Sequence, residues 1–173
     1  INDYFDEING VTTMTGLIKS GAGTLTLGGN SAYTGATDVT GGTLLVNGAL
    51  GNVMWGPIQL GTTQVAVASG ASLGGAGSIA GGVSVADGGI LLGRAGQTLS
   101  MGSLALSGGV LGGTGSLVVG GASSWLAGTQ TGTGTTRYDG ALALSGLGAK
   151  VLSGGRTVTL NGTTTWSGNT AAN

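Results

Sequence analysis

Aspartate is the side chain of this sequence best suited to acid–base chemistry, because the chain contains no histidine and no cysteine. Asp38, Asp87 and Asp139 are separated by 49 and 52 positions. Hydrolysis or elimination at a sugar needs neighbouring carboxylates, or a carboxylate beside a cation, on one face. Neither interval is a multiple of the roughly 19-residue repeat of the chain, so we do not expect one cluster. The sequence therefore predicts no enzyme and no cofactor.

Metal, phosphate and nucleic-acid sites are equally poorly supported. Without cysteine and histidine, the two commonest transition-metal ligands are missing. The glycine-rich run 74–77 is not followed by the Gly-Lys-Ser/Thr ending of a phosphate loop. The net charge is −1, and the five cations are dispersed, whereas phosphate backbones are bound by clustered cations. These cations are Lys19, Arg94, Arg137, Lys150 and Arg156.

The N-terminal segment, positions 1–15, lies outside the repeat and holds three of the six acids. Three interpretations remain open for this segment. It could cap the open edge of the first coil, form a strand that joins a neighbouring subunit, or bind calcium. Calcium is the least favoured, because it takes six or more oxygen ligands. The candidate partner-contact residues are Tyr4, Phe5, Asp6 and Glu7.

The composition indicates an ordered chain made of strands and turns. Glycine accounts for 41 of 173 residues, but a single proline and the lack of a Gly-x-y period exclude collagen. The hydrophobic content of 40% occurs in short runs bounded by Gly, Ser and Thr, which argues against disorder. No apolar stretch approaches the roughly 18 residues of a membrane helix.

An internal repeat determines the predicted fold. Residues 66–79 match residues 104–117 at a shift of 38 without a gap, and Leu142–Gly146 is identical to Leu104–Gly108. Similar units recur at intervals of roughly 19 to 22 positions, so a shift of 38 spans two coils. We predict an all-β parallel β-solenoid over residues 16–173 with about eight coils. A sandwich or barrel is the competing fold, and it would show hairpin signals without a fixed period.

Stacked coils bury the apolar side chains that a single coil would leave exposed. Equivalent Leu, Val and Ile residues would form ladders at about 4.8 Å per rung around a narrow, solid interior. Glycine would occupy the corners, and Asn47-Gly48 and Asn161-Gly162 look like equivalent corners.

Several polar and aromatic residues have plain structural interpretations. Lys19 and Asp38, 19 positions apart, could pair across adjacent rungs, whereas Arg137 and Arg156 would stack like charges unless Asp139 or solvent intervenes. All four are expected on a solvated face.

The tryptophans are expected to plug coils or cover an end rather than to bind sugars. Threonine pairs do not recur on every coil, so no ice-binding lattice is expected. The three tryptophans are Trp55, Trp125 and Trp166.

The run Gly21–Gly48 carries three motifs in order: G-x-G-T-L-T-L, N-x-x-Y-T-G and G-G-T-L-x-V-x-G. It resembles the autotransporter-associated β-strand repeat of bacterial passenger domains, and Leu73–Leu92 looks like the motif that often follows it. Segments 125–136 and 142–168 resemble Thr/Gly-rich repeats of large bacterial surface proteins. The resemblance implies a right-handed β-helix outside the cell, and the family has no shared catalytic residues to carry over.

Two functions are expected from these observations. The first is a non-catalytic stalk or passenger segment of a bacterial surface adhesin. The alternative is a self-assembling subunit of an extracellular fibre, sheath or matrix, linked through its N-terminal segment. The low charge suits dense association. The expected partners are copies of the chain, flanking repeats, or a host or matrix surface, without nucleic acid and without membrane insertion.

Overall fold

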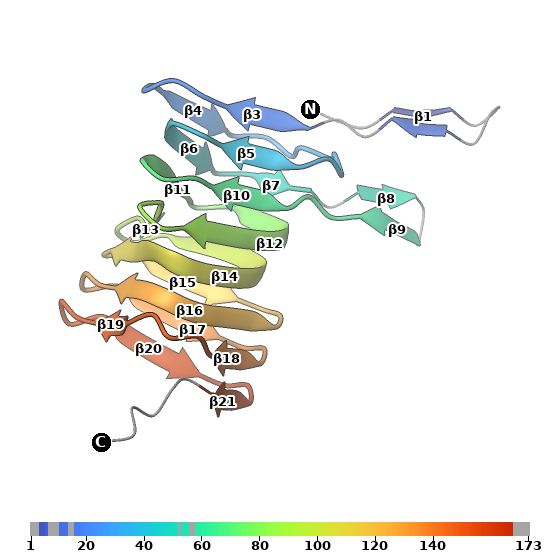
Figure 1. The fold of residues 1–173 in the computed structure, drawn as a ribbon. Coiled ribbons are helices and arrows are strands. Elements are labelled where there is room, and N and C mark those ends of the chain that lie inside the picture. The colour runs from blue at the N-terminus through green and yellow to red at the C-terminus, as the bar shows by residue number, and fades with distance from the viewer. Residues whose placement is uncertain (1–3, 7–10, 14–15, 52, 56–57, 168–173) are drawn as a thin grey trace, which may run out of the picture.

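The chain is a stack of three-sided coils, seen in a computed structural model that describes residues 4–6, 11–13, 16–51, 53–55 and 58–167 (Figure 1). Every regular element in these residues is a β-strand, and 17 of the strands form one sheet with parallel pairing. Among the described residues there is no helix long and apolar enough to cross a membrane. The predicted parallel β-solenoid is therefore confirmed.

Each coil contributes a strand to each of three faces, here called faces A, B and C in chain order, and β12, β14 and β16 turn corners between faces. Face A contains β3 (Leu17–Lys19), β5 (Thr37–Val39), β10 (Val65–Val67), part of β12 (Ser78–Ala86), part of β14 (Thr98–Gly113), part of β16 (Ser123–Gln130), β18 (Leu142–Leu144) and β21 (Thr164–Trp166). Face B contains β4 (Thr24–Leu27), β6 (Gly42–Val46), β11 (Ala71–Gly75), β13 (Ile90–Gly93), the ends of β14 and β16, and β19 (Lys150–Leu152). Face C contains β7 (Ala49–Leu50), the starts of β12 and β14, β15 (Ser116–Val119), β17 (Thr135–Tyr138) and β20 (Thr157–Leu160).

The strand registers give the length of each coil. Along face A, Leu17 pairs with Thr37, Val65 with Val83, and Val83 with Leu104, at intervals of 20, 18 and 21 positions. The later coils on this face repeat at intervals of 19 to 22 positions. The stack makes about seven turns, close to the eight predicted.

A leucine ladder fills the interior behind face B. Leu44, Leu73, Leu91 and Leu111 lie in register on successive strands, and none is exposed to solvent. Their neighbours alternate between inward and outward positions, since successive side chains of a strand point to opposite faces. The inward side chains thus form one continuous apolar column instead of a separate core for each coil.

Residues 38 positions apart in the sequence are in register two coils apart on only part of each coil. Leu73 and Leu111 are two coils apart, as are Leu104 and Leu142, so these predictions are confirmed. Ala66, however, stacks through Ser84 onto Ala105, which is 39 positions away. Irregular register in the pairing of β12 with β14 displaces the alignment at the corners.

Two antiparallel hairpins lie outside the coils. β8 (Val53–Trp55) pairs with β9 (Ile58–Gly61), and β1 (Tyr4–Asp6) pairs with β2 (Val11–Thr13). Figure 1 shows both hairpins projecting from the stack. The first is inserted between β7 and β10, and it lengthens that coil so that Thr37 and Val65, 28 positions apart, are in register. The regular repeat within the predicted solenoid gave no sign of this insertion.

Three of the four candidate partner-contact residues lie in the N-terminal hairpin. Tyr4, Phe5 and Asp6 form β1, which pairs with β2 and has no pairing with β3, whereas Glu7 lies outside the described residues. The cap and the subunit-linking strand therefore both stay predictions.

The two Asn-Gly pairs occupy different corners. Asn47-Gly48 follows β6 on face B, whereas Asn161-Gly162 follows β20 on face C, so their expected equivalence was wrong. TLLVNG and TVTLNG look alike because inward and outward residues alternate in the same way on every face. Asn47 Oδ1 accepts a hydrogen bond from the Ala76 amide of the next coil at 3.2 Å.

Candidate functional site

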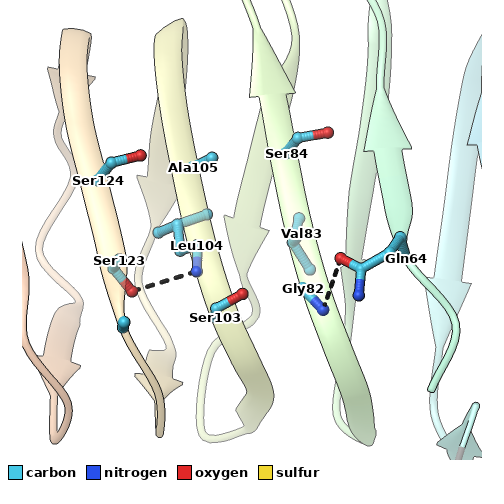
Figure 2. Close-up of a pocket in the computed structure, with 10 residues that line it drawn as sticks. Gln64, Gly82, Val83, Ser84, Ser103, Leu104, Ala105, Ser123 and Ser124 are labelled. Carbon is cyan, nitrogen blue, oxygen red and sulfur yellow. Dashed lines mark hydrogen bonds between the residues drawn. The ribbon is translucent and has the colours of Figure 1, made fainter. Parts of the chain in front are cut away.

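A shallow groove of about 350 Å³ crosses face A and the corner before it (Figure 2). The outward positions of β12, β14 and β16 carry Ser84, Ala105 and Ser124, which lie in register on adjacent rungs. Small side chains at one register position leave a continuous hollow across the coils. The groove is lined by Gln64, Gly82, Val83, Ser84, Ser103, Leu104, Ala105, Ala122, Ser123 and Ser124.

Two polar side chains of the groove, those of Gln64 and Ser123, form hydrogen bonds within the fold. Gln64 Oε1 accepts a hydrogen bond from the Gly82 amide at 3.1 Å, and Ser123 Oγ accepts one from the Leu104 amide at 3.2 Å (Figure 2). No residue in the lining is charged or aromatic. Such a surface can supply hydroxyl and amide hydrogen bonds, but it has neither an acid–base pair nor a ring for stacking on sugars. Sequence reasoning missed this groove, because its outward positions hold only small side chains without distinctive chemistry.

The three candidate carboxylates lie on different coils. Asp38 is on β5, in register with Ile18 and Ala66. Asp87 follows β12, and Asp139 follows β17. Among the described residues, no group of three or more His, Cys, Asp or Glu side chains could hold a metal ion.

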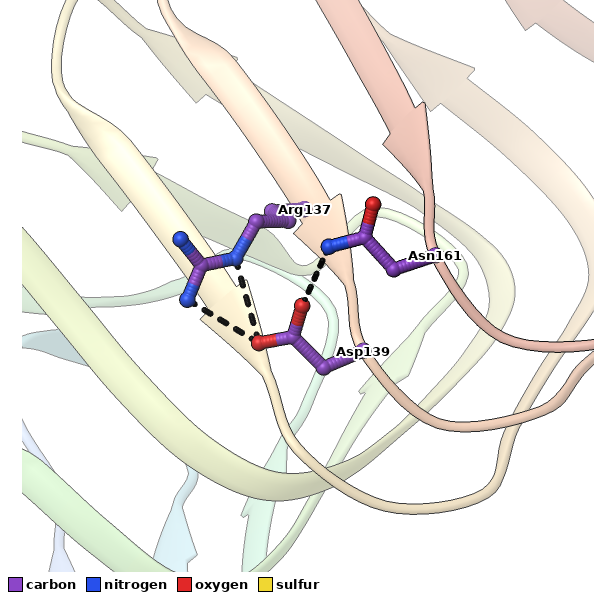
Figure 3. A network of polar contacts seen from close by, with 3 residues as sticks. All are labelled: Arg137, Asp139 and Asn161. Atoms are coloured by element: carbon purple, nitrogen blue, oxygen red, sulfur yellow. Dashed lines mark hydrogen bonds and ion pairs between the residues drawn. The ribbon is translucent and has the colours of Figure 1, made fainter.

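Asp139 belongs to an exposed polar network with two neighbours (Figure 3). Its Oδ2 accepts a hydrogen bond from Arg137 Nε at 3.1 Å and lies 3.0 Å from Arg137 Nη2. Its Oδ1 accepts one from Asn161 Nδ2 of the next coil at 2.7 Å. These hydrogen bonds, that of Asn161 first, hold the pKa of Asp139 below its ordinary value. Arg137 stacks on Thr159, so the expected stacking of two arginines does not occur.

Two cations expected on a solvated face are buried instead. Lys19 is in register with Val39, one position beyond Asp38, and its Nζ donates to three main-chain carbonyls. The ion pair with Asp38 was therefore wrong. Arg156 is 4% exposed and is also bound to carbonyl oxygens. Composition could not reveal this, because an inward lysine and an outward lysine differ by a single step of register.

A buried polar cluster interrupts the apolar ladders in the last coils. Gln130 takes the ladder position after Leu111, and its Nε2 donates to Tyr138 Oη at 3.1 Å. Thr136 Oγ1 accepts a hydrogen bond from Arg156 Nε at 2.8 Å. Burial raises the pKa of Tyr138 to about 12, although the hydrogen bond from Gln130 and the charge of Arg156 act in the opposite direction.

The stability of the fold should fall between about pH 10 and about 12 through Tyr138. Its pKa is 10.0 in the unfolded reference and about 12 in the fold, so the stabilising effect is complete below pH 10.0. It is lost as the pH rises through the folded value. A shift of about two units corresponds to about 2–3 kcal/mol. Urea unfolding at a series of alkaline pH values measures this fall in stability. Tyr138→Phe should remove most of this slope, whereas Tyr33→Phe should keep most of it; equal slopes in Tyr138→Phe and the parent would contradict the assignment.

The tryptophans differ in exposure, and several threonines lie in an outward ladder. Trp125 is 7% exposed and plugs the interior, as expected, whereas Trp166 on the last coil is 70% exposed. Trp125 and Trp166 both stack on Leu144, which confirms that they are two coils apart. Trp55 lies in β8 of the inserted hairpin. An outward hydroxyl ladder crosses four coils of face C at Thr98, Ser116, Thr135 and Thr157.

Comparison with known proteins supports the family resemblance. Residues 17–46 match the passenger-associated-transport-repeat family. No curated protein and no solved structure matched the chain. The matched segment spans β3 to β6, so it builds the first coil and most of the second. This repeat suggests a secreted or surface-exposed protein. With its parallel β-solenoid and the match over residues 17–46, the chain fits an autotransporter passenger repeat.

Proposed function

We propose that the chain is a non-catalytic structural segment of a bacterial surface passenger, which holds neighbouring segments away from the cell. The observation that carries this proposal is the in-register ladder that begins in the matched repeat and continues through the stack. Leu25, Leu44, Leu73, Leu91 and Leu111 align over five successive coils. A rod of this kind gains length with each repeat and needs no active site.

An adhesive surface is part of the proposal, and face A supports it. The groove offers serine hydroxyls on alternate rungs, with few side chains that must be displaced. A surface without charge or aromatic anchors binds weakly at each contact, so affinity would come from many contacts along the rod. Ser84 and Ser124 are two rungs apart and mark the two sides of Ala105.

Removal of two complete coils tests the spacer function. Deleting residues 65–103 places Leu104 at the ladder position of Val65, because Val65, Val83 and Leu104 are in register. We expect the shortened chain to fold cooperatively and to be about 10 Å shorter by small-angle X-ray scattering, since each rung adds about 4.8 Å. Deleting residues 65–93 removes an incomplete number of coils and should prevent folding. If the 65–103 deletion also fails to fold, the spacer proposal is wrong.

Substitution in the groove tests adhesion. Beads coated with the full chain would be applied to cultured epithelial cells, and Ser84→Arg with Ser124→Arg should reduce their retention at least ~3-fold. The matched control places arginine at Thr98 and Thr157, on the outward hydroxyl ladder of face C. Equal retention of both double variants would place adhesion elsewhere on the chain.

A self-assembling fibre subunit is the second candidate, and the last coil favours it. Leu152, Leu160 and Trp166 continue three interior ladders, yet they are 53%, 46% and 70% exposed. Another coil could cover them. Negative-stain microscopy of the full chain separates the candidates: a spacer gives single short rods, and a fibre subunit gives filaments. Deleting residues 1–10 should abolish filaments if the N-terminal segment joins subunits, and filaments that persist would reject that role.

A further inference from the structure

The charged residues of the solenoid are concentrated near the two ends of the stack. Between residues 39 and 136 the chain contains only two charged side chains, Asp87 and Arg94. Lys19 lies on β3 in the first coil, and Arg156 lies between β19 and β20 in the last described coil (Figure 1). Both are buried, at 7% and 4% exposure. Burial of a charge is unfavourable unless many polar partners surround it, so their placement calls for a physical reason.

Main-chain carbonyls of two adjacent coils surround Lys19. Its Nζ donates to Ser20 O and Gly21 O at 2.8 Å each, in the turn between β3 and β4. It also donates to Gly41 O at 2.9 Å, in the turn between β5 and β6. All three donor protons of the ammonium group are thus satisfied. Lys19 therefore ties the corner of the first coil to the same corner of the second.

Arg156 connects the last coil to the two coils before it. Nε donates to Thr136 Oγ1 at 2.8 Å, and Nη2 donates to Thr135 O at 3.0 Å. Nη1 lies within 3.1 to 3.4 Å of the carbonyl oxygens of Thr131, Gly112 and Gly113. None of these partners is a carboxylate. The guanidinium group therefore links three successive coils at once.

We propose that Lys19 and Arg156 are clamps that hold the first and last described coils to their neighbours through carbonyl oxygens of those neighbours. Within the described residues, strands of a middle coil are paired on both sides, whereas β3, β4, β19 and β20 are each paired on one side, and strands paired on one side separate first. Carbonyls at glycine corners such as Gly41 and Gly113 have no side chain of their own to shield them, and a long cation can reach them from the next coil. Fraying of a coil would break a charge-assisted hydrogen-bond network, so the clamps oppose it.

Hydrogen exchange read by mass spectrometry on the full chain tests the clamps. Lys19→Met should accelerate exchange about 10- to 100-fold in residues 16–46, because several charge-assisted hydrogen bonds are lost. Arg156→Met should do so in residues 142–167. Exchange in residues 83–106 should be unchanged in both. Arg94→Met is the matched control, because Arg94 is an exposed cation of a middle coil, and it should leave all three regions unchanged. A uniform change along the chain, or no change at the ends, would overturn the proposal.

Conservative variants distinguish the effect of the charge on exchange from the effect of side-chain packing. Lys19→Arg and Arg156→Lys keep the charge but alter the hydrogen-bond geometry, and their end coils should exchange more slowly than those of the methionine variants. If Arg156→Met does not fold, Arg156→Lys decides the test, with protection lost first in residues 142–167. Loss that begins in the middle coils would contradict the clamp.

Discussion

Replacing Leu91 by aspartate should unfold the central coils. Leu91 is fully buried between Leu73 and Leu111 in the face B ladder. The substitution removes a leucine from a close-packed column, which alone is worth about 2–5 kcal/mol, and it places a carboxylate where no partner is available. The expected loss of at least ~5 kcal/mol is comparable with the whole stability of a domain. Urea unfolding followed by circular dichroism measures it.

Leu92 provides the matched control, because it is the next residue of the same strand and points outward. It is 38% exposed. Leu92→Asp should change stability by less than ~1 kcal/mol, since solvent hydrates the new carboxylate. A similar loss for both variants would show that alternate residues of β13 do not face inside and outside, and the solenoid register would then be wrong.

Replacing Gly75 by alanine should destabilise the corner between faces B and C. Gly75 has φ of +137°, a conformation that residues with a Cβ rarely adopt. A Cβ added there would collide with the carbonyl oxygen of Val46 on the preceding coil. Neither atom can move away easily, because both belong to main chains held in the sheet. Strain and overpacking together should reduce the free energy of unfolding by roughly 2–5 kcal/mol, measured by thermal and urea unfolding.

Gly23 is the control for this substitution. It has no positive φ, and an added Cβ would have nothing within 4 Å. Gly23→Ala should therefore leave the stability within about 0.5 kcal/mol of the parent, or raise it slightly by restricting the unfolded chain. If Gly75→Ala were as harmless as Gly23→Ala, the close stacking of corner backbones would be contradicted.

The ladders could be predicted from sequence because stacking repeats the same chemistry at equivalent positions. Leu73 and Leu111 have similar surroundings, so the sequence around them is similar as well. Corners are different, because a bulge or an added residue there changes the interval without changing any inward side chain. For that reason Ala66 and Ala105 are 39 positions apart, although a 38-residue repeat surrounds them.

The hairpin and the buried cations could not be predicted for two separate reasons. The segment 53–61 contains short apolar runs as the coil strands do, and antiparallel pairing depends on neighbours that the sequence does not specify. Lys19 was expected opposite Asp38 at an interval of 19 positions, but the interval in the first coil is 20, which places Lys19 in register with the buried Val39. A single step of register reverses the direction of a side chain. The groove was missed because small residues on a strand carry no chemical signal of their own.

Disulfide formation across the rungs tests the central claim most directly, because the chain has no cysteine of its own. Ser84, Ala105 and Ser124 lie on three successive strands of face A. Adjacent rungs are about 4.8 Å apart, within reach of a disulfide, whereas two rungs span about 10 Å and exceed it. Cysteine pairs 84/105 and 105/124 should therefore oxidise to intramolecular disulfides in the folded chain, and pair 84/124 should stay reduced. A disulfide in 84/124, or none in the two adjacent pairs, would contradict the stacked coils.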